Sequence, residues 1–464
     1  MRNAKILATV GPASDNPETL EALIRAGVDG FRLNFSHGSI EQHRATLARI
    51  RAASETVGKL VAVLGDLSGP KIRCGTFASG PVELREGAPF TLTTRAVPGD
   101  QSVVSCTYPL ARDLKVGDTI LLDDGLLRLR VARVHEDDVA CVVEVGGTLS
   151  DRKGINVPGA TLSVPALTDK DRRDAAAGVE MGVDYFALSF VRTARDLEEA
   201  QGLIGETPLV AKVEKPEAVL NLESVIDACD GVMVARGDLG VELGTEKVPL
   251  VQKRAIRMTN ARGKLVITAT QMLDSMIRSP RPTRAEAADV ANAVLDGTDV
   301  LMLSGETASG RYPIEAVTTM GTIIQEIEGS DVYRALEAMG PFEDWDFAHA
   351  CAASAAITSR HQKLAAVVVF TRLGHTANMV ADYRPRAPII AVCGAEAAAR
   401  RMALQWGTIP VHHAMPRRAE DAVTLAAELA QRLCKAQPGD TIAVVSGSQR
   451  DTGTKYFALH TLSA

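Results

Sequence analysis

The stretch Pro208-Leu-Val-Ala-Lys-Val-Glu-Lys-Pro216 is an apolar run of strand length that ends in charged residues. Alternate residues of a β-strand share a face, so Lys212 and Glu214 are expected to point the same way. A second run, Gly231-Val-Met-Val-Ala-Arg-Gly-Asp-Leu-Gly240, delivers Asp238. Two carboxylates suit a hard divalent cation such as Mg²⁺, and an ammonium beside them can neutralise charge on a reacting group. These runs predict a site for electrostatic catalysis on an anion.

Runs of the same kind recur along the chain and alternate with helical patterns. Eight of them are Lys5 to Val10, Gly30 to Phe35, Leu60 to Leu64, Asp184 to Ser189, Leu209 to Val213, Gly231 to Ala235, Lys264 to Ala269 and Val300 to Leu303. Helix-start signals such as Asn16-Pro-Glu-Thr-Leu20 stand between most of them. Strand then helix, eight times over, predicts a closed parallel (β/α)8 barrel of the TIM type.

About a hundred residues separate the third predicted strand from the fourth, whereas the other connections are only long enough for a helix. This segment, Gly69 to Pro165, has short strand-like runs separated by Gly, Pro and Asp turns, which indicates a small antiparallel β-barrel. The runs are Val82 to Leu84, Phe90 to Thr94, Thr119 to Leu122, Leu126 to Val134 and Val139 to Val145. Because the insertion leaves the barrel at a strand end, we expect a lid over the catalytic face.

The C-terminal part has the pattern of an open, mostly parallel α/β sheet with helices on both sides. It follows a linker-like segment, Gly340 to Asp346. Its predicted strands are Ala365 to Phe370, Pro388 to Val392, Ile409 to His412, Thr441 to Val445 and Tyr456 to Leu462. We therefore predict a catalytic barrel of residues 1–68 and 166–338, an inserted lid of residues 69–165 and a C-terminal domain of residues 345–464.

Composition narrows the function classes. The chain has 464 residues and a formal net charge of −6, and its basic residues are scattered, which disfavours a nucleic-acid partner. No apolar run reaches membrane-spanning length, and the N-terminal apolar stretch is too short for a secretory signal. The 7 cysteines form no Cys-x-x-Cys pair, which favours reduced thiols and a cytoplasmic location. Small-molecule partners are expected.

Polar residues crowd the ends of six predicted barrel strands, the face on which barrel enzymes place their chemistry. They include Arg32, Asp66, Arg73, Lys212, Glu214, Asp238, Thr270 and Glu306. A single charge at a strand end is usually a solvated cap, but six converging ends favour a site. Arginine can fork onto a phosphate or carboxylate. No P-loop or dinucleotide-binding motif is present, so a nucleotide would be held in another way.

The residues at these strand ends resemble pyruvate kinase, and the similarity runs from Ile6 nearly to the C-terminus. The blocks that carry it are Ala8-Thr-Val-Gly-Pro-Ala-Ser14, Arg32-Leu-Asn-Phe-Ser-His-Gly38, Lys212-Val-Glu214, Met233-Val-Ala-Arg-Gly-Asp-Leu-Gly240, Ala269-Thr-Gln-Met-Leu273 and Leu301-Met-Leu-Ser-Gly-Glu-Thr-Ala308. The resemblance implies transfer of the phosphoryl group of phosphoenolpyruvate to ADP, giving pyruvate and ATP in glycolysis, and a homotetramer in the cytoplasm.

By the same resemblance, Glu214 and Asp238 bind Mg²⁺ or Mn²⁺, and Lys212 stabilises charge on the phosphoryl group. Arg32, Lys212, Gly237, Asp238 and Thr270 are implied to hold the substrate, with Lys212, Thr270 and Arg32 as the catalytic set. Thr270 is expected near the enolate carbon, where it helps deliver a proton. The residues implied to face the nucleotide are Asn34, Phe35, Ser36, His37, Arg73 and Lys153.

Lys71 departs from the pattern of the potassium-dependent members, which have Glu at its place. The oxygens implied to bind potassium are nevertheless present, on Asn34, Ser36, Asp66 and the carbonyl of Leu67. Our hypothesis is that the ammonium of Lys71 substitutes for potassium, so that K⁺ is dispensable. The alternative is that Lys71 is a solvated residue of the lid hinge.

A loop of the C-terminal domain resembles the effector-phosphate loop of regulated members. The residues concerned are Thr371, Arg372, Gly374 and Thr376, with the late loop Ser446-Gly-Ser-Gln-Arg-Asp-Thr-Gly-Thr454. Leu373 stands where a serine is common, which removes one hydroxyl donor and disfavours fructose 1,6-bisphosphate. A sugar phosphate or a nucleotide remains a candidate effector.

Two rival interpretations stay open at the sequence level. A barrel enzyme that handles phosphoenolpyruvate or pyruvate in carbon-carbon chemistry would also use a divalent metal with Glu and Asp, but it does not explain the lid or Lys153. A metabolite-sensing relative without turnover would be expected to have a broken set of rim residues, and the set here is intact.

Overall fold

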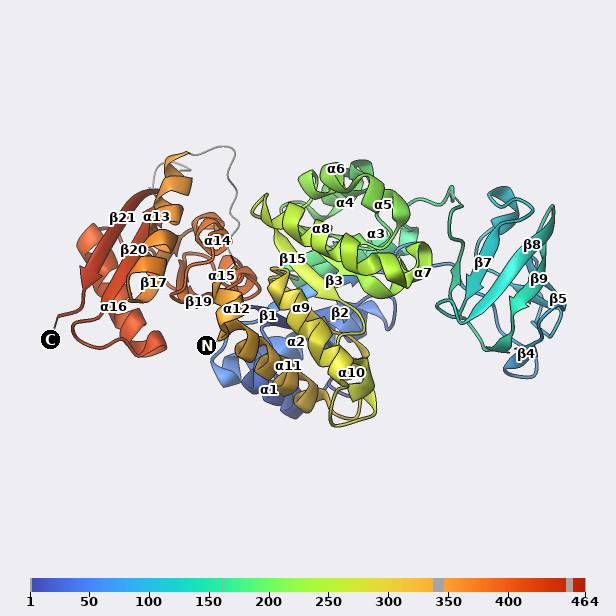
Figure 1. The fold of residues 1–464 in the computed structure, drawn as a ribbon, viewed down its shortest axis with the longest axis horizontal. Helices are drawn as coiled ribbons and strands as arrows, with labels where there is room; N and C mark the ends of the chain where they lie inside the picture. Colours follow the sequence, from blue (N-terminus) through green and yellow to red (C-terminus); the bar gives the residue numbers. More distant parts are fainter. Residues whose placement is uncertain (1, 161, 337–345, 448–453, 464) are drawn as a thin grey trace.

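Three bodies lie in a row, with a barrel in the middle, an all-β body at one end and an α/β body at the other (Figure 1). The computed structural model describes residues 2–160, 162–336, 346–447 and 454–463. Within these ranges, no helix is long and apolar enough to cross a membrane. The predicted domain boundaries stay predictions, and the one between residues 338 and 345 falls outside the described residues.

The central body is a closed barrel of eight parallel strands in the order β1-β16-β15-β14-β13-β12-β3-β2, as the alternating pattern predicted. The strands are β1 (Lys5–Thr9), β2 (Gly30–Asn34), β3 (Ala62–Leu67), β12 (Tyr185–Leu188), β13 (Leu209–Val213), β14 (Gly231–Ala235), β15 (Leu265–Ala269) and β16 (Val300–Leu303). The third strand runs three residues further than predicted. Its last residues pair with β2 and β12, so Asp66 lies inside the ladder rather than in a loop.

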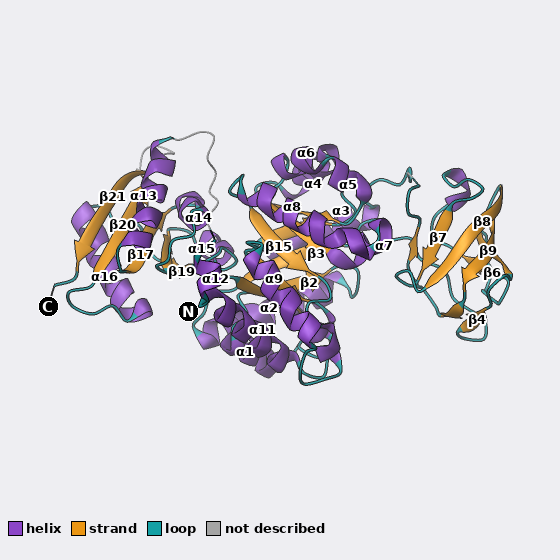
Figure 2. Ribbon diagram, viewed as in Figure 1, coloured by secondary structure: helices purple, strands orange, loops and turns teal. Residues whose placement is uncertain are grey.

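Helices surround the barrel (Figure 2). They are α1 (Pro17–Ala26), α2 (Ile40–Val57), α3 (Asp169–Met181), α4 (Ala194–Ile204), α5 (Pro216–Leu220), α6 (Leu222–Asp227), α7 (Arg236–Leu243), α8 (Val248–Asn260), α9 (Arg284–Leu295), α10 (Gly305–Ala308), α11 (Pro313–Glu328) and α12 (Asp331–Arg334). Helix α2 begins with a capping box between Ser39 and Gln42, and α3 with one between Thr168 and Asp171. Alternate strand residues face opposite ways, and this places one apolar core inside the barrel and another under the helices.

The inserted body leaves the barrel after β3, returns before α3 and has its own apolar core. Its six-stranded sheet has the order β11-β7-β8-β9-β5-β6, antiparallel except for the parallel β5–β6 pair, and β10-β4 forms a second ribbon. The strands are β4 (Val82–Leu84), β5 (Pro89–Thr93), β6 (Val103–Ser105), β7 (Thr119–Leu122), β8 (Leu127–His135), β9 (Asp138–Val145), β10 (Gly147–Leu149) and β11 (Ile155–Asn156). The sequence analysis predicted the short strand β4, whose Val82-Glu-Leu84 alternates, but not the equally short β6, β10 and β11.

The C-terminal body is an open sheet in the order β19-β18-β17-β20-β21, parallel except for its last pair. It consists of β17 (Leu364–Thr371), β18 (Ile389–Cys393), β19 (Thr408–His412), β20 (Thr441–Gly447), β21 (Thr454–Thr461), α13 (Phe347–His361), α14 (His375–Asp382), α15 (Glu396–Met402) and α16 (Ala419–Cys434). Helices α13, α14 and α15 pack on one face and α16 on the other. The predicted linker lies outside the described residues up to residue 345, and Asp346 caps α13.

Candidate active site

The polar strand ends lie on the barrel face toward the inserted body (Figure 1). A cleft of about 750 Å³ separates the two. The barrel side of the cleft includes Arg236, Asp238 and Thr270, and the other side includes Lys71 and Arg128. The insertion therefore lies over the face that carries the predicted site, where a lid is expected.

A buried network of charges occupies the ends of β2, β3 and β13. The Asp66 carboxylate accepts a hydrogen bond from Arg32 Nε at 2.6 Å and lies 3.3 Å from Lys212 Nζ. The Lys212 ammonium also lies 2.9 Å from Glu214 Oε1 and donates to Ser189 Oγ at 2.7 Å. The predicted same-face relation of Lys212 and Glu214 thus takes the form of a direct ion pair.

The network favours the charged forms of Lys212 and Asp66. Burial alone would lower the pKa of Lys212, but Asp66 and Glu214 outweigh it and raise that pKa above the ordinary value. Burial alone would raise the pKa of Asp66, but Lys212 and Arg32 hold it below the usual range. Lys212 is therefore a permanent cation at neutral pH.

Glu214 and Asp238 have the chemistry of a cation site. Burial raises the pKa of Glu214, with a further contribution from the charge of Asp238, and Lys212 opposes the shift. The Phe190 amide donates to Glu214 Oε2 at 2.9 Å, which orients the carboxylate. Asp238 stands in the first turn of α7, with Lys71 Nζ 3.6 Å from its Oδ1.

Two hard oxygen donors whose charges repel each other fit a divalent cation between them. The described residues contain no group of three or more His, Cys, Asp or Glu arranged for a metal. Substrate and water oxygens would therefore complete the coordination shell, as is usual for Mg²⁺.

Thr270 and the Gly237 turn are held in close contact. Thr270 follows β15 with φ +75°, a left-handed conformation that is costly for a β-branched residue. Arg236 Nη2 donates to the Thr270 carbonyl at 2.7 Å, and Arg236 Nη1 pairs with Asp289 at 2.6 Å. A Cβ on Gly237 would lie 3.0 Å from Thr270 Cγ2. The arrangement orients the Thr270 side chain toward the turn that carries Asp238.

Four of the predicted nucleotide residues lie at the end of β2 and in the loop after it. Asn34 Oδ1 accepts from the Ser36 amide at 3.1 Å, and Lys170 Nζ donates to the Phe35 carbonyl. Phe35 is 1% exposed, and its ring belongs to the apolar core under the helices. Its amide also donates to the Asp66 carbonyl at 3.0 Å, so both of its backbone polar groups have partners within the protein. Partial burial and the charge of Arg73 lower the pKa of His37.

The two predicted nucleotide residues of the insertion make contacts inside it. Arg73 Nη1 donates to the Arg152 carbonyl at 3.2 Å. Lys153 Nζ lies 2.8 Å from Asp123 Oδ1. Both side chains therefore make contacts in the two segments that connect the lid to the barrel, which we call its stems. Arg73 lies in the outgoing stem, which leaves the barrel after β3, and Lys153 lies in the returning stem, which leads back to α3.

Lys71 does not lie at the oxygens proposed for potassium. The Asp66 carboxylate is occupied by Arg32 and Lys212, and the Leu67 carbonyl accepts from Ser189 Oγ at 2.7 Å. Lys71 lies instead at Asp238, where it adds positive charge beside a carboxylate of the cation site.

The sequence analysis did not identify Ser189 and Lys170 as site residues. It did include Glu306 among the polar residues at the ends of the barrel strands. Ser189 ends a predicted strand, so its position was a usable signal, whereas nothing in the sequence marks Lys170. The Glu306 carboxylate accepts from the backbone amides of Leu273 at 3.0 Å and Ser304 at 2.7 Å. The Glu306 carboxylate thus connects the loops that follow β15 and β16 and has a structural role.

The predicted effector loop joins β17 to α14. Thr371 is 4% exposed, and its Oγ1 accepts from the Gly374 amide at 3.0 Å. Gly374 has φ +103°, and a Cβ there would lie 2.6 Å from Met402 Cε. Residues 448–453 of the late loop lie outside the described residues.

Comparisons with known proteins agree with this geometry. The family model described as the pyruvate kinase barrel domain matches residues 1–317, and that of the pyruvate kinase alpha/beta domain matches residues 349–456. The pyruvate kinase of Geobacillus stearothermophilus is 44% identical over 100% of this chain and 81% of its own length. The pyruvate kinases of Clostridium perfringens and Mycobacterium tuberculosis are 42% and 44% identical over 96% and 97% of this chain and 96% of their own lengths. The chain therefore belongs to the pyruvate kinase family.

Proposed function

We propose that the barrel rim transfers the phosphoryl group of phosphoenolpyruvate to ADP, giving pyruvate and ATP, with Lys212 as the central catalytic residue. The observation that carries the proposal is the buried cluster in which Lys212 is held 2.9 Å from Glu214 and 3.3 Å from Asp66. Phosphoryl transfer needs positioning and charge neutralisation more than covalent help from the protein. The buried, positively charged ammonium of Lys212 would supply the charge neutralisation.

The substrate is proposed to lie between Arg32, Lys212 and the Gly237-Asp238 turn. Glu214 and Asp238 would hold the divalent cation that the family needs, for which we propose Mg²⁺, with Mn²⁺ as a substitute. When bound, such a cation would supply positive charge that neutralises the anionic substrate. In this proposal the Lys212 ammonium would face the phosphoryl group as it moves, and Thr270 would help deliver a proton to the enolate carbon.

ADP is proposed to bind between the loop after β2 and the lid stems. The residues proposed to face it there are Asn34, Phe35, Ser36, His37, Arg73 and Lys153. Partial burial and the charge of Arg73 lower the pKa of His37, which supports the proposal that both residues face the same ligand. The cationic side chains of Arg73 and Lys153 suit an anionic phosphate chain.

The direct test is a coupled assay of pyruvate formation from phosphoenolpyruvate. We expect formation to require both ADP and a divalent cation and to stop on addition of EDTA. The transferred phosphoryl group should appear in ATP. Pyruvate formation at the same rate without ADP would contradict the proposal.

We further propose that Lys71 replaces potassium, because its ammonium already lies 3.6 Å from Asp238 Oδ1. Turnover is expected to persist when sodium or tetramethylammonium is the only monovalent cation. In Lys71→Glu the local charge changes sign, so turnover without potassium should fall by about tenfold or more and recover when potassium is added. Assays at equal ionic strength check this, and near-total loss of wild-type turnover in potassium-free buffer would contradict it.

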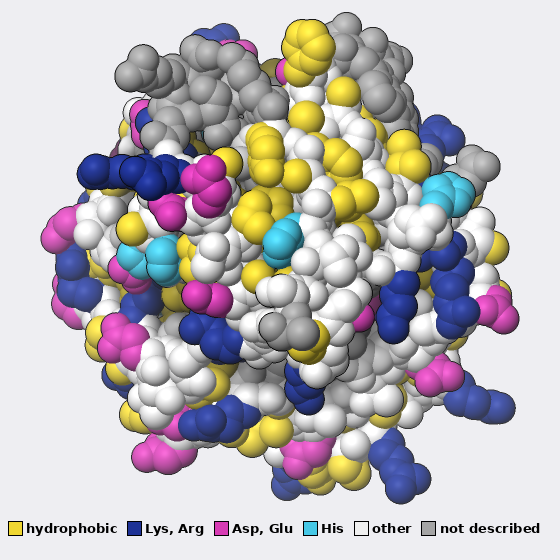
Figure 3. Space-filling view, turned by 90° about the vertical axis from the view of Figure 1, so that its left-hand side faces the viewer, with side chains coloured by type: hydrophobic (Ala, Val, Ile, Leu, Met, Phe, Trp, Pro, Cys, Tyr) yellow, Lys and Arg dark blue, Asp and Glu magenta, His cyan; other side chains and the backbone are white. Residues whose placement is uncertain are grey.

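A homotetramer in the cytoplasm also remains a proposal. Helix α13 lies against β21, and exposed apolar side chains gather on this end of the molecule (Figure 3). They include Phe347, Ile357, Tyr456 and Leu459. Such a face suits contact with a second copy of the chain. Binding of a sugar phosphate or nucleotide by the loop of Thr371, Arg372, Gly374 and Thr376 stays a prediction.

A further inference from the structure

A buried polar triad joins the returning stem of the lid to the barrel. Asn156, in β11, donates from Nδ2 to Glu242 Oε1 at 2.8 Å, and Lys215 Nζ donates to the same oxygen at 2.6 Å. Asn156 is 5% exposed and Glu242 is 7% exposed. We call these three residues the stem triad. None of them belongs to the site proposed above.

Each member of the stem triad is attached to a different part of that site. Lys215 follows Glu214 directly in the chain. Glu242 lies in α7, four residues after Asp238 and therefore on the same side of the helix. Asn156 lies in the lid stem, three residues after Lys153. One carboxylate oxygen thus connects the lid with the backbone of both proposed cation ligands.

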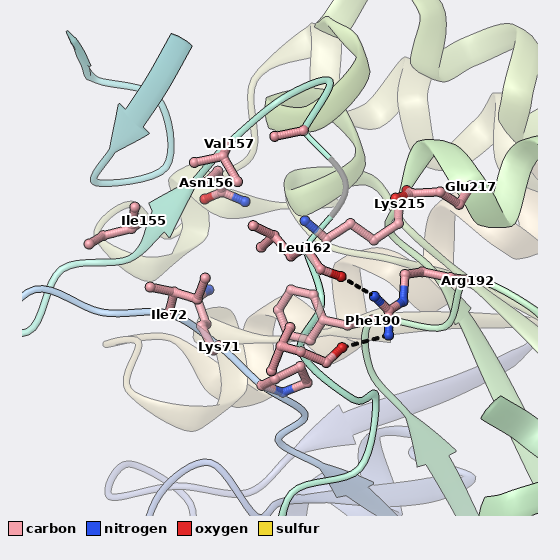
Figure 4. Close-up of a pocket in the computed structure, with 13 residues that line it drawn as sticks. Lys71, Ile72, Ile155, Asn156, Val157, Leu162, Phe190, Arg192, Lys215 and Glu217 are labelled. Carbon is pink, nitrogen blue, oxygen red and sulfur yellow. Dashed lines mark hydrogen bonds between the residues drawn. The ribbon is translucent and has the colours of Figure 1, made fainter. Parts of the chain in front are cut away.

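The contacts around the triad restrict movement of the stem. Arg192 donates to the carbonyls of Leu162 at 2.8 Å and Val164 at 2.7 Å, which anchors the barrel end of the same stem (Figure 4). In that view the Lys215 side chain extends toward Asn156. Lys215 Nζ also lies 5.6 Å from the centre of the Phe190 ring, and the Phe190 amide holds Glu214.

Helix α7 is in contact with the outgoing stem as well, through Lys71 and Asp238. The two stems therefore reach α7 at its first turn and at Glu242. Hydrogen bonds to a buried carboxylate are stronger than neutral ones, and losing one leaves a charge short of a donor. A lid movement that leaves α7 behind would break the Asn156 contact, so the lid and α7 are expected to move together.

We propose that Glu242 is a positioning residue that couples the lid to the two carboxylates of the cation site. Occupation of the barrel by cation and phosphoenolpyruvate then sets the position of the lid before ADP is phosphorylated. The inference rests on the proposed function, because it takes Glu214 and Asp238 as the cation ligands. It adds a physical connection through which binding of the cation and phosphoenolpyruvate positions the lid for phosphorylation of ADP.

The test compares wild type with Asn156→Ala, which removes only the lid contact, and Glu242→Gln, which removes the charge that Lys215 neutralises. Glu144→Gln is the matched control, since it breaks the Arg130–Glu144 pair of 2.7 Å inside the lid. Hydrogen exchange is followed in peptides covering residues 153–157 and 236–243. Each protein is measured alone and with Mg²⁺ plus phosphoenolpyruvate but no ADP.

In wild type and Glu144→Gln, Mg²⁺ plus phosphoenolpyruvate is expected to slow exchange in both segments. In Asn156→Ala, the segment 236–243 should still respond and the segment 153–157 should not. In Glu242→Gln, which leaves Lys215 without its anionic partner, the responses of both segments should weaken. Turnover at saturating substrates should fall about tenfold in Asn156→Ala, because lid closure completes the site, with the KM for phosphoenolpyruvate within about twofold of wild type.

A purely structural role for the triad would lower thermal stability and leave the response of segment 153–157 intact. That response in a folded Asn156→Ala protein with wild-type turnover would overturn the inference. If the wild type itself makes no pyruvate from phosphoenolpyruvate and ADP, the proposed function fails instead. The exchange response to Mg²⁺ plus phosphoenolpyruvate still reports on the coupling in that case.

Discussion

Substitution Lys212→Met is expected to lower kcat by about a thousandfold or more, because it removes the ammonium proposed to face the transferred phosphoryl group. Single preorganised charges and donors at such positions contribute factors of about 10² to 10³, and charged groups on a moving phosphoryl contribute more. Steady-state pyruvate formation at saturating phosphoenolpyruvate, ADP and Mg²⁺ measures the effect. The KM for ADP should change little, since Lys212 is not among the residues proposed to hold the nucleotide.

The same substitution leaves Glu214 and Asp66 with one cation fewer, so a loss of stability has to be separated from a loss of catalysis. Lys59→Met is the matched control, because Lys59 pairs with Asp29 at 3.0 Å near the starts of β2 and β3, at the opposite end of the barrel. Thermal unfolding of both variants identifies the folded fraction. Wild-type turnover in a folded Lys212→Met protein would refute the role proposed for the lysine.

Substitution Glu214→Gln is expected to weaken divalent-cation affinity by about a hundredfold, since one of the two proposed charged ligands becomes a neutral amide. Turnover at low Mg²⁺ should fall in parallel and recover in part at high Mg²⁺. Titration with Mn²⁺, followed by its electron paramagnetic resonance signal, measures binding without reference to activity. The lid variant Glu144→Gln should bind Mn²⁺ as wild type does.

The pH dependence of binding follows from the environment of Glu214. Burial and the charge of Asp238 raise its pKa, so protons compete with the cation at a higher pH than they would at an exposed glutamate. Affinity for Mn²⁺ should therefore fall as the pH is lowered toward that raised pKa. In Glu214→Gln this part of the pH dependence should disappear, and an unchanged profile would count against Glu214 as a ligand.

Much of the barrel was predictable because each strand is marked by a run of neighbouring apolar residues. The strands β13 and β14 were predicted with the bounds that the structure shows, since both are continuous apolar runs with clear ends. The short strands β6, β10 and β11 were not, because their pairing depends on partners elsewhere in the lid. Their residues carry no pattern of their own.

The sequence predicted which residues lie at the ends of the barrel strands, but it did not predict which side chains contact one another there. The sequence places Lys212 and Glu214 on one face of a strand, and the structure pairs them at 2.9 Å. Phe35 was expected at the nucleotide, yet its ring fills the core, because strand alternation continues into the loop after β2. Lys71 was predicted only as a charge that substitutes for potassium, and its position 3.6 Å from Asp238 Oδ1 could not be read from the sequence.

The sequence alone therefore determined the eightfold alternation, the inserted lid and the set of charges at the strand ends, because periodicity and strand termini are properties of neighbouring residues. Only the tertiary structure decided which charges meet. Asn156 and Glu242 are 86 residues apart, and their contact depends on where the lid stem crosses α7. That contact joins two bodies with separate apolar cores, and no local pattern in the sequence specifies it.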